Sequence, residues 1–211
     1  MGTAADPAAD PAAGTIADPR ERIILAAEEL IAERGLGASL RDIAVAAGQR
    51  NNSAVHYYFG SRDGLIRAIL DRRMEPMEQR RLGLLTSHEV AGRDDDVRAL
   101  VEIMVRPMFT VPYQDGSTHY ARFLEQVRTH PAIADARLSP EHWPAVQIIA
   151  ARLDRALGGL PVRTRRRRLA SMATVLFALL ADRERSPRRS HRATEEDVID
   201  MLVGLLTAGA G

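Results

Sequence analysis

The sequence predicts an all-α protein with about nine helices. Hydrophobic residues make up 45% of the 211 residues but aromatic residues only 4%, so the core has to be built mainly from Leu, Ile, Val and Ala. Apolar residues recur at helical spacing in one segment after another, and no segment shows the convincing alternation that indicates a strand. Gly, Pro and capping residues stand between these segments, where helices begin and end.

The first helix is expected to follow a disordered tail. Residues 1–17 are mostly Ala, Pro, Asp and Gly, a composition that buries too little apolar surface to fold. Asp18 is placed to cap the helix, Pro19 suits its first position, and Glu21 lies where the acid of a capping box reaches back. An apolar stripe follows, and Gly35 marks the end of the helix.

Two short helices are predicted next. Segment 39–47 carries apolar residues on one face and ends at Gly48, and segment 53–59 follows a polar turn. A fourth helix begins soon after, and we expect Pro76 and Gly83 to interrupt it.

The remaining chain continues the helical pattern, which divides the protein into an N-terminal domain of residues 18–72 and a second domain of residues 73–211. The stripes of the second domain begin near Val97, Tyr120, Val146, Pro161 and Thr194.

The two short helices have the arrangement of a helix-turn-helix, because a helix packs before them and another follows. The second short helix and its turn are more polar than packing requires. Their outward side chains match the hydrogen-bonding groups of base edges and phosphates, at the end of the helix that enters a major groove. These side chains are Arg50, Asn51, Asn52, Ser53, His56 and Tyr57, whereas Val55, Tyr58 and Phe59 can face inward. The alternative is a solvated turn followed by a short surface helix.

This region resembles the N-terminal signature of the TetR family of repressors over about residues 20–72. The matching residues are Ser39-Leu40-Arg41-Asp42-Ile43-Ala44, Ala47-Gly48, His56-Tyr57-Tyr58-Phe59-Gly60-Ser61-Arg62 and Leu65. The turn after Gly48 is one residue longer than usual, His56 replaces the usual Tyr, and Arg62 replaces the usual Lys. The resemblance implies double-stranded DNA as a partner, adds Ser39 and Arg41 to the DNA-binding residues, and makes Arg62 a phosphate clamp.

The last two helices are predicted to form a homodimer interface. Residues 172–181 are apolar on nearly every face, and residues 198–206 are similarly broad. A fully buried internal helix is the alternative. The resemblance favours a two-fold interface, which would present two half-sites about 34–36 Å apart to a pseudo-palindromic operator.

Adaptable and aromatic side chains on the middle helices predict a mostly apolar effector cavity. Each of them taken alone is more often an ordinary core residue than a ligand contact. The candidates are Met104, Met108, Phe109, Tyr113, Tyr120, Phe123, Trp143, Gln147, Met172 and Phe177. We expect a lipophilic or aromatic effector, such as a fatty acyl group. The resemblance to the TetR family implies that such an effector pushes the helix of residues 61–73 and releases the operator.

Other classes of function are less well supported. The chain has no cysteine, no metal-ligand spacing among its histidines and no catalytic motif, so we expect no catalytic residues, metal or cofactor. No apolar run is long enough for a membrane span, and the bacterial cytoplasm, on the nucleoid when DNA is bound, is the expected location. An activator, a helical interaction or lipid-carrier module and, less well, a helical enzyme remain as alternatives.

Overall fold

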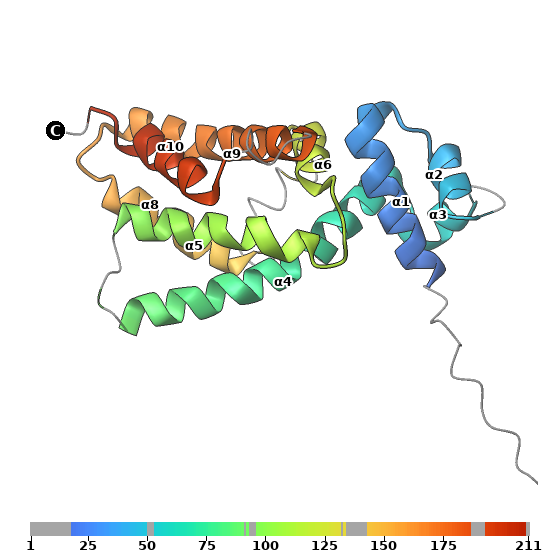
Figure 1. The fold of residues 1–211 in the computed structure, drawn as a ribbon, viewed down its shortest axis with the longest axis horizontal. Helices are drawn as coiled ribbons and strands as arrows, with labels where there is room; N and C mark the ends of the chain where they lie inside the picture. The colour runs from blue at the N-terminus through green and yellow to red at the C-terminus, as the bar shows by residue number, and fades with distance from the viewer. Residues whose placement is uncertain are drawn as a thin grey trace, which may run out of the picture.

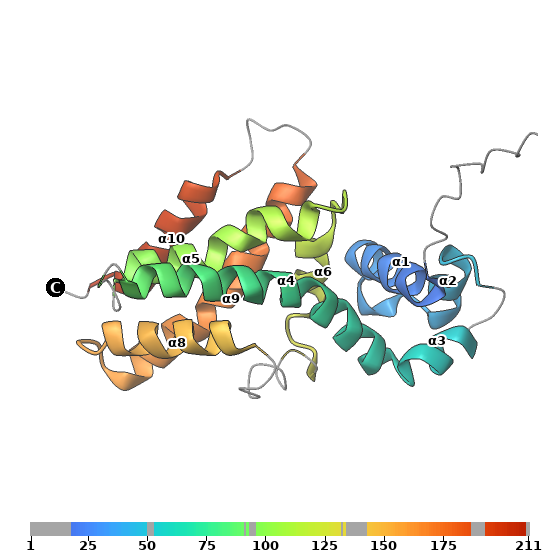
Figure 2. The same ribbon diagram turned by 90° about the horizontal axis from the view of Figure 1, so that it is seen from below.

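A computed structural model of the chain describes residues 18–49, 53–90, 92, 96–131, 133, 143–186 and 193–209. Over these ranges it contains nine α-helices, two short 3-10 helices and no strand, which confirms the all-α prediction. One end of an elongated molecule is formed by helices α1 (Pro19–Arg34), α2 (Leu40–Ala46) and α3 (Ser53–Phe59). Helix α4 (Arg62–Val90) runs from this end into a larger helical group (Figures 1 and 2). The expected disordered tail, residues 1–17, lies outside the described residues.

Helix α1 (Pro19–Arg34) begins and ends where local chemistry predicts. The Asp18 side chain accepts a hydrogen bond from the backbone N–H of Arg20 at 3.2 Å. At the other end, Gly35 has a φ of 68°, a conformation that costs glycine little. The prediction of a capping box for Glu21 is wrong. Its carboxylate instead accepts a hydrogen bond from Nε of Arg72 on α4, at 2.5 Å.

Helices α2 (Leu40–Ala46) and α3 (Ser53–Phe59) lie within the predicted segments. The Ser39 hydroxyl caps α2 by accepting a hydrogen bond from the Asp42 backbone N–H at 3.0 Å. Ile43 of α2 and Val55 of α3 are fully buried. The helix-turn-helix arrangement is therefore present, with its two short helices packed on α1 and α4.

Helix α4 (Arg62–Val90) passes through both residues that were expected to interrupt it, so this prediction is wrong. A proline removes one backbone donor and bends a helix, but buried contacts on both sides can hold the helix together. Leu70 and Met77, on either side of Pro76, are both buried. The helix is visibly bent along its length (Figure 2).

The second domain is built from the remaining helices around α4. They are α5 (Val97–Thr110), α6 (Tyr120–Val127), α8 (Pro144–Ala156), α9 (Val162–Arg185) and α10 (Glu195–Thr207). Thr194 and Asp197 form a reciprocal capping box at the start of α10. In the part of the chain that the structure describes, no helix is both long and apolar enough to cross a membrane.

The Arg165–Arg168 run of α9 has structural partners. Nε of Arg165 donates to Asp154 of α8 at 2.6 Å. The Arg168 guanidinium donates to the backbone oxygens of Leu206 at 2.7 Å and Ala208 at 2.5 Å. These carbonyls lie at the C-terminal end of α10, where a cation is favourable. Arg165 and Arg168 of this run therefore link α9 to α8 and α10.

Candidate DNA-binding surface and effector cavity

Helix α3 presents polar side chains outward while Val55 anchors it to the core. Ser53, His56 and Tyr57 are exposed, Tyr57 at 83%, and Arg41 is exposed on the neighbouring helix α2. The structure thus brings together four of the predicted DNA-binding side chains on adjacent short helices. Arg50, Asn51 and Asn52 lie outside the described residues.

Three residues of the predicted site, His56 among them, have local structural partners. Ser39 caps α2, and Nδ1 of His56 lies 3.2 Å from the Gly60 carbonyl oxygen. Nη1 of Arg62 donates to the Leu36 carbonyl at 2.9 Å, and Nη2 donates to the Ala38 carbonyl at 2.5 Å. These contacts tie the turn between α1 and α2 to the start of α4. A phosphate contact by Arg62 would have to use its other N–H groups, and its role as a clamp stays a prediction.

Tyr58 was expected to be able to face inward, but the structure leaves it 36% exposed. Its ring packs edge-on against Tyr57, with the ring centroids 5.0 Å apart, and both tyrosines border a surface hollow beside Gly48 and Gln49. Helical spacing puts Tyr58 on the side of Val55, but a seven-residue helix at the surface leaves one edge of that side open. Residue spacing alone gives no signal of this exposure.

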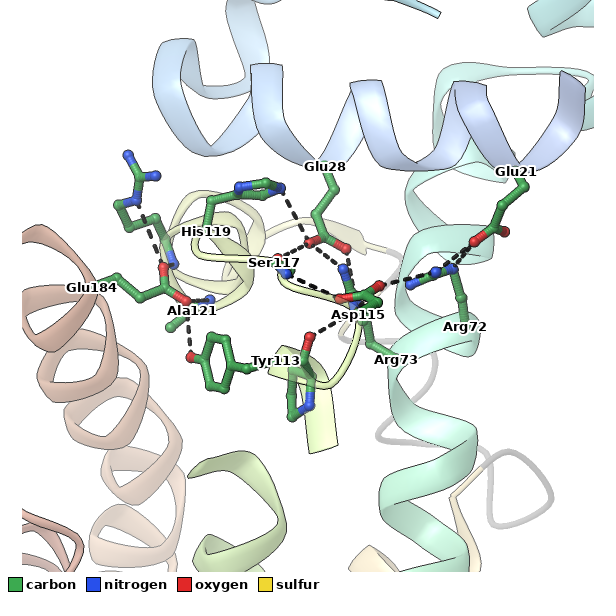
Figure 3. A network of polar contacts seen from close by, with 12 residues as sticks. Glu21, Glu28, Arg72, Arg73, Tyr113, Asp115, Ser117, His119, Ala121 and Glu184 are labelled. Carbon is green, nitrogen blue, oxygen red and sulfur yellow. Dashed lines mark hydrogen bonds and ion pairs between the residues drawn. The ribbon is translucent and has the colours of Figure 1, made fainter. Parts of the chain in front are cut away.

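A buried polar network joins the N-terminal domain to the second domain (Figure 3). Glu28 of α1 is fully buried, and its carboxylate accepts two hydrogen bonds from Arg73 of α4, at 2.7 and 2.8 Å. Nη1 of Arg73 also donates to the Pro112 carbonyl at 2.7 Å and to Asp115 at 2.8 Å. The Ser117 hydroxyl donates to Glu28 at 3.0 Å. One arginine therefore connects α1, α4 and the loop before α6.

The network extends on both sides of Arg73 (Figure 3). Arg72 bridges Glu21 of α1 and Asp115, at 2.5 and 3.1 Å. Further along, Glu184 of α9 accepts hydrogen bonds from the Tyr113 hydroxyl and the Ala121 backbone N–H, each at 2.8 Å. The bond from Ala121 places the Glu184 carboxylate at the start of α6, where the helix dipole favours a negative charge.

The charges of the network reinforce one another. Burial by itself disfavours a charged Arg73, but its bonds to Glu28 and Asp115 outweigh burial and raise its pKa. Burial likewise opposes ionisation of Asp115, yet its bonds from Arg73 and from the Ser117 backbone N–H hold its pKa below the ordinary value. Both groups are therefore held in their charged forms at neutral pH.

The lowered pKa of Asp115 predicts a pH-dependent contribution to stability. A carboxylate whose pKa is lower in the folded state stabilises above its unfolded pKa of about 3.9 and loses this contribution as the pH falls through the folded value. Asp115→Asn should therefore be less stable than the wild type at pH 7 and lose less stability on acidification below about pH 4. Urea unfolding midpoints at several pH values measure this. If the unfolding midpoints of wild type and variant fall in parallel as the pH is lowered, the prediction is wrong. Asp182→Asn, which changes an exposed carboxylate of α9, is the control.

The second domain contains a partly open cavity of about 380 Å³ between α4, α5, α6, α8 and α9, a volume typical of small-molecule sites. Its walls are mainly Leu, Met, Ala and aromatic side chains. Six of the ten predicted cavity residues line it, namely Met104, Met108, Trp143, Gln147, Met172 and Phe177.

The other four predicted residues do not line this cavity, and each has another role. The Phe109 ring lies beneath the guanidinium of Arg183, whose Cζ is 5.0 Å from the ring centroid. Tyr113 donates to Glu184 in the junction network. Tyr120 and Phe123 are buried in the core, with stacked rings 6.2 Å apart. Residue type suggested all four, but the direction of each side chain is set by tertiary packing.

Arg81 of α4 lines the cavity and was missed by the sequence analysis. Arg81 is 1% exposed, although it ends the polar run Glu78-Gln79-Arg80-Arg81, which suggests a surface segment. Nε and Nη2 donate to the Met104 carbonyl at 3.2 and 3.0 Å, and Nη1 donates to Glu78 at 3.2 Å. Burial lowers the pKa of Arg81, and Glu78 opposes this effect.

No group of three or more His, Cys, Asp or Glu side chains in the described ranges could hold a metal ion. The described residues provide an exposed polar surface on α2 and α3, the junction network and the apolar cavity. These features support recognition by hydrogen bonds and by apolar contacts.

Comparison with known proteins relates both halves of the chain to one family. Residues 23–69 match the family described as bacterial regulatory proteins, tetR family. Residues 102–209 match the tetracyclin repressor-like C-terminal domain, which is 108 of the 211 residues.

Individual proteins are similar to this chain at lower identity. The HTH-type transcriptional dual regulator CecR of Shigella flexneri is 28% identical over 142 residues, a match that covers 63% of each chain. The match thus spans less than two thirds of the length of that relative. Two solved structures share the fold. One, from Rhodococcus sp. and described as a TetR-family regulator, is 19% identical with a TM-score of 0.55, covering 92% of this chain and 99% of that one. The other is NalD of Pseudomonas aeruginosa, 21% identical with a TM-score of 0.53, covering 92% and 97%.

Proposed function

The chain belongs to the TetR family of bacterial transcriptional regulators, and from this premise we propose that it is a repressor released from its operator by a small, mostly apolar effector. DNA-binding regulation, and not enzymatic catalysis, is the function of the family. Release by an effector is supported by one observation. Helix α4 lines a ligand-sized apolar cavity and also packs against the helix-turn-helix unit.

The DNA contacts are proposed to come from α2, α3 and the turn between them. Ser53 and Tyr57 of α3 and Arg41 of α2 are exposed and can reach base edges or phosphates. Arg50, Asn51 and Asn52, in the turn, are included on the sequence argument alone. The N-terminal end of a recognition helix enters the major groove, which agrees with this set.

The operator is proposed to be bound by a homodimer formed through α9 and α10. The core of a single chain leaves several apolar side chains of these helices partly exposed. Met201 is half exposed, and Val175, Leu179, Val203 and Leu205 are only partly covered. A two-fold interface covering this face would explain its composition and would supply two recognition helices.

Release is proposed to pass from the cavity to α1 through α4. Leu70 and Met74 line the cavity, and Arg72 and Arg73 lie between them on the same helix. Arg73 holds Glu28 of α1, so a ligand that displaces α4 at the cavity also moves the helix-turn-helix unit. Coupling of this kind typically changes affinity about 5- to 150-fold.

DNA binding by the purified protein tests the proposal. A fragment from upstream of its coding sequence should bind tightly, with an affinity that falls steeply with salt because counterions are released. Arg50→Ala/Asn52→Ala and Tyr57→Ala should weaken specific binding, by about 1–3 kcal/mol for each side chain that no longer reaches a base. The variant Arg166→Gln/Arg167→Gln removes two exposed charges of α9 and should bind normally.

Two results would count against this reading. If neither this fragment nor genomic fragments in a binding selection are bound specifically, a lipid-carrier or interaction module becomes the better interpretation. If the variant of Arg166 and Arg167 loses binding while Tyr57→Ala keeps it, the DNA surface has been misplaced.

An activator is a second candidate, because CecR is described as a dual regulator. NalD is described as the secondary repressor of a multidrug efflux pump, and this description favours the proposal that the present chain is a repressor. Transcription from the bound promoter with and without the protein separates the two.

A further inference from the structure

Among the described residues that line the cavity, Arg81 is the only one with a charged side chain. The other walls there are apolar, apart from the amide of Gln147 and the indole N–H of Trp143. A buried guanidinium is costly unless its N–H groups are satisfied and its charge is balanced. Glu78 and the Met104 carbonyl meet part of this cost, and Arg81 remains the charged group on this wall that can bind an anionic part of a ligand.

The known partners of Arg81 leave part of its hydrogen-bonding capacity unused. A guanidinium has five N–H groups. Three of them reach Met104 and Glu78, which leaves one N–H on each Nη atom with no hydrogen bond among the described residues. Each of these N–H groups can donate a charge-assisted hydrogen bond to an oxygen of an anionic ligand.

The charge of Glu78 is directed away from the cavity. Glu78 borders a separate surface groove with Trp143 and Pro144 and does not line the cavity. Its second oxygen accepts a hydrogen bond from the Ala145 backbone N–H at 2.7 Å, at the start of α8, where the helix dipole stabilises an anion. Glu78 is therefore held by α8 as well as by Arg81, and the charge that faces the cavity is that of Arg81.

We propose that the effector is an amphipathic carboxylic acid, whose apolar body fills the cavity and whose carboxylate is bound by Arg81. This inference rests on the proposed function for its regulatory meaning, but the binding step can be tested without DNA. Trp143 is the only tryptophan of the chain and lines the cavity, so its fluorescence reports occupancy directly.

The test compares acids with matched alcohols of two shapes. Dodecanoate is paired with 1-dodecanol, and 4-cyclohexylbutanoate with 4-cyclohexyl-1-butanol, all below micelle-forming concentrations. At least one acid should change the Trp143 fluorescence of the wild type and bind about 10- to 100-fold more tightly than its alcohol, the range expected for a hydrogen-bonded charge. Equal affinities within both pairs, or no response to any probe, would overturn the proposal.

The decisive variant removes both charges at once. Arg81→Met alone would leave Glu78 buried without its partner and could unfold the protein. Arg81→Met/Glu78→Gln keeps the volume, and the amide oxygen can still accept from Ala145. With its helicity and thermal unfolding checked, this variant should lose the preference for the acid and keep alcohol binding. Arg155→Gln, an exposed position on α8, should keep the wild-type preference. An unchanged preference in the double variant would overturn the proposal.

The same probes separate this inference from the proposed function. Operator release by acid and alcohol with equal affinity would leave the regulator intact and exclude head-group recognition by Arg81. Tight acid binding dependent on Arg81, with no specific DNA binding, would uphold the carboxylate site and contradict the repressor.

Discussion

Replacing Gly204 with arginine is expected to turn the proposed dimer into a monomer. Binding to the proposed operator should then weaken by about 100-fold or more, because two linked half-sites gain that much from simultaneous binding. Gly204 is exposed on α10, and a Cβ at this position would meet no atom within 4 Å. The fold of the single chain should therefore be unaffected, and the helix itself gains from the replacement of glycine. In a closely packed two-fold interface, the added charge would be buried without a partner.

A matched control is available on α4. Gly83 is also helical and exposed, with open space at its Cβ position, so Gly83→Arg has the same intrinsic effects outside the proposed interface. Sedimentation and operator titration should show a dimer with normal affinity for Gly83→Arg and a monomer with weak affinity for Gly204→Arg. A dimeric Gly204→Arg protein with unchanged DNA affinity would mean that this face of α10 is not the interface.

Substituting Glu28 by alanine is expected to lower the free energy of unfolding by about 3–5 kcal/mol, the cost of leaving a buried charge without its partner. Glu28 is fully buried and receives two hydrogen bonds from Arg73 and one from Ser117. After its removal, Arg73 keeps Asp115, which is partly exposed and shared with Arg72. The destabilisation should appear as a lower urea midpoint and a lower melting temperature.

The neighbouring Glu29 provides the control, since it is exposed on the same helix and Glu29→Ala should change stability by less than about 0.5 kcal/mol. Removing both charges of the pair in Glu28→Met/Arg73→Met should cost less than removing Glu28 alone. If Glu28→Ala and Glu29→Ala are equally stable, the network does not stabilise the junction. Operator affinity should also fall in Glu28→Ala, because α1 is then held less firmly on α4.

The helices that local chemistry defines could be predicted from the sequence. Ser39 caps α2, Thr194 caps α10, and α3 runs over the predicted residues 53–59. Caps and glycine stops act through neighbouring residues, so they can be read from a few consecutive letters. The failure at Pro76 has the opposite origin, because packing on both sides of the proline overrides a local preference for ending the helix.

The sequence by itself determined the helical class, the helix-turn-helix and the apolar character of the second domain, because residue spacing and capping are short-range properties. Tertiary structure alone decided where buried polar groups meet. Glu28 and Arg73 are 45 positions apart, and Arg81 looks like a surface residue until α5 and α8 close over it. Side-chain direction in a cavity or a junction depends on which helices pack together, and residue type does not encode this locally. For that reason six of the ten expected cavity residues are in place, while the charged residue that best identifies the ligand emerged only from the fold.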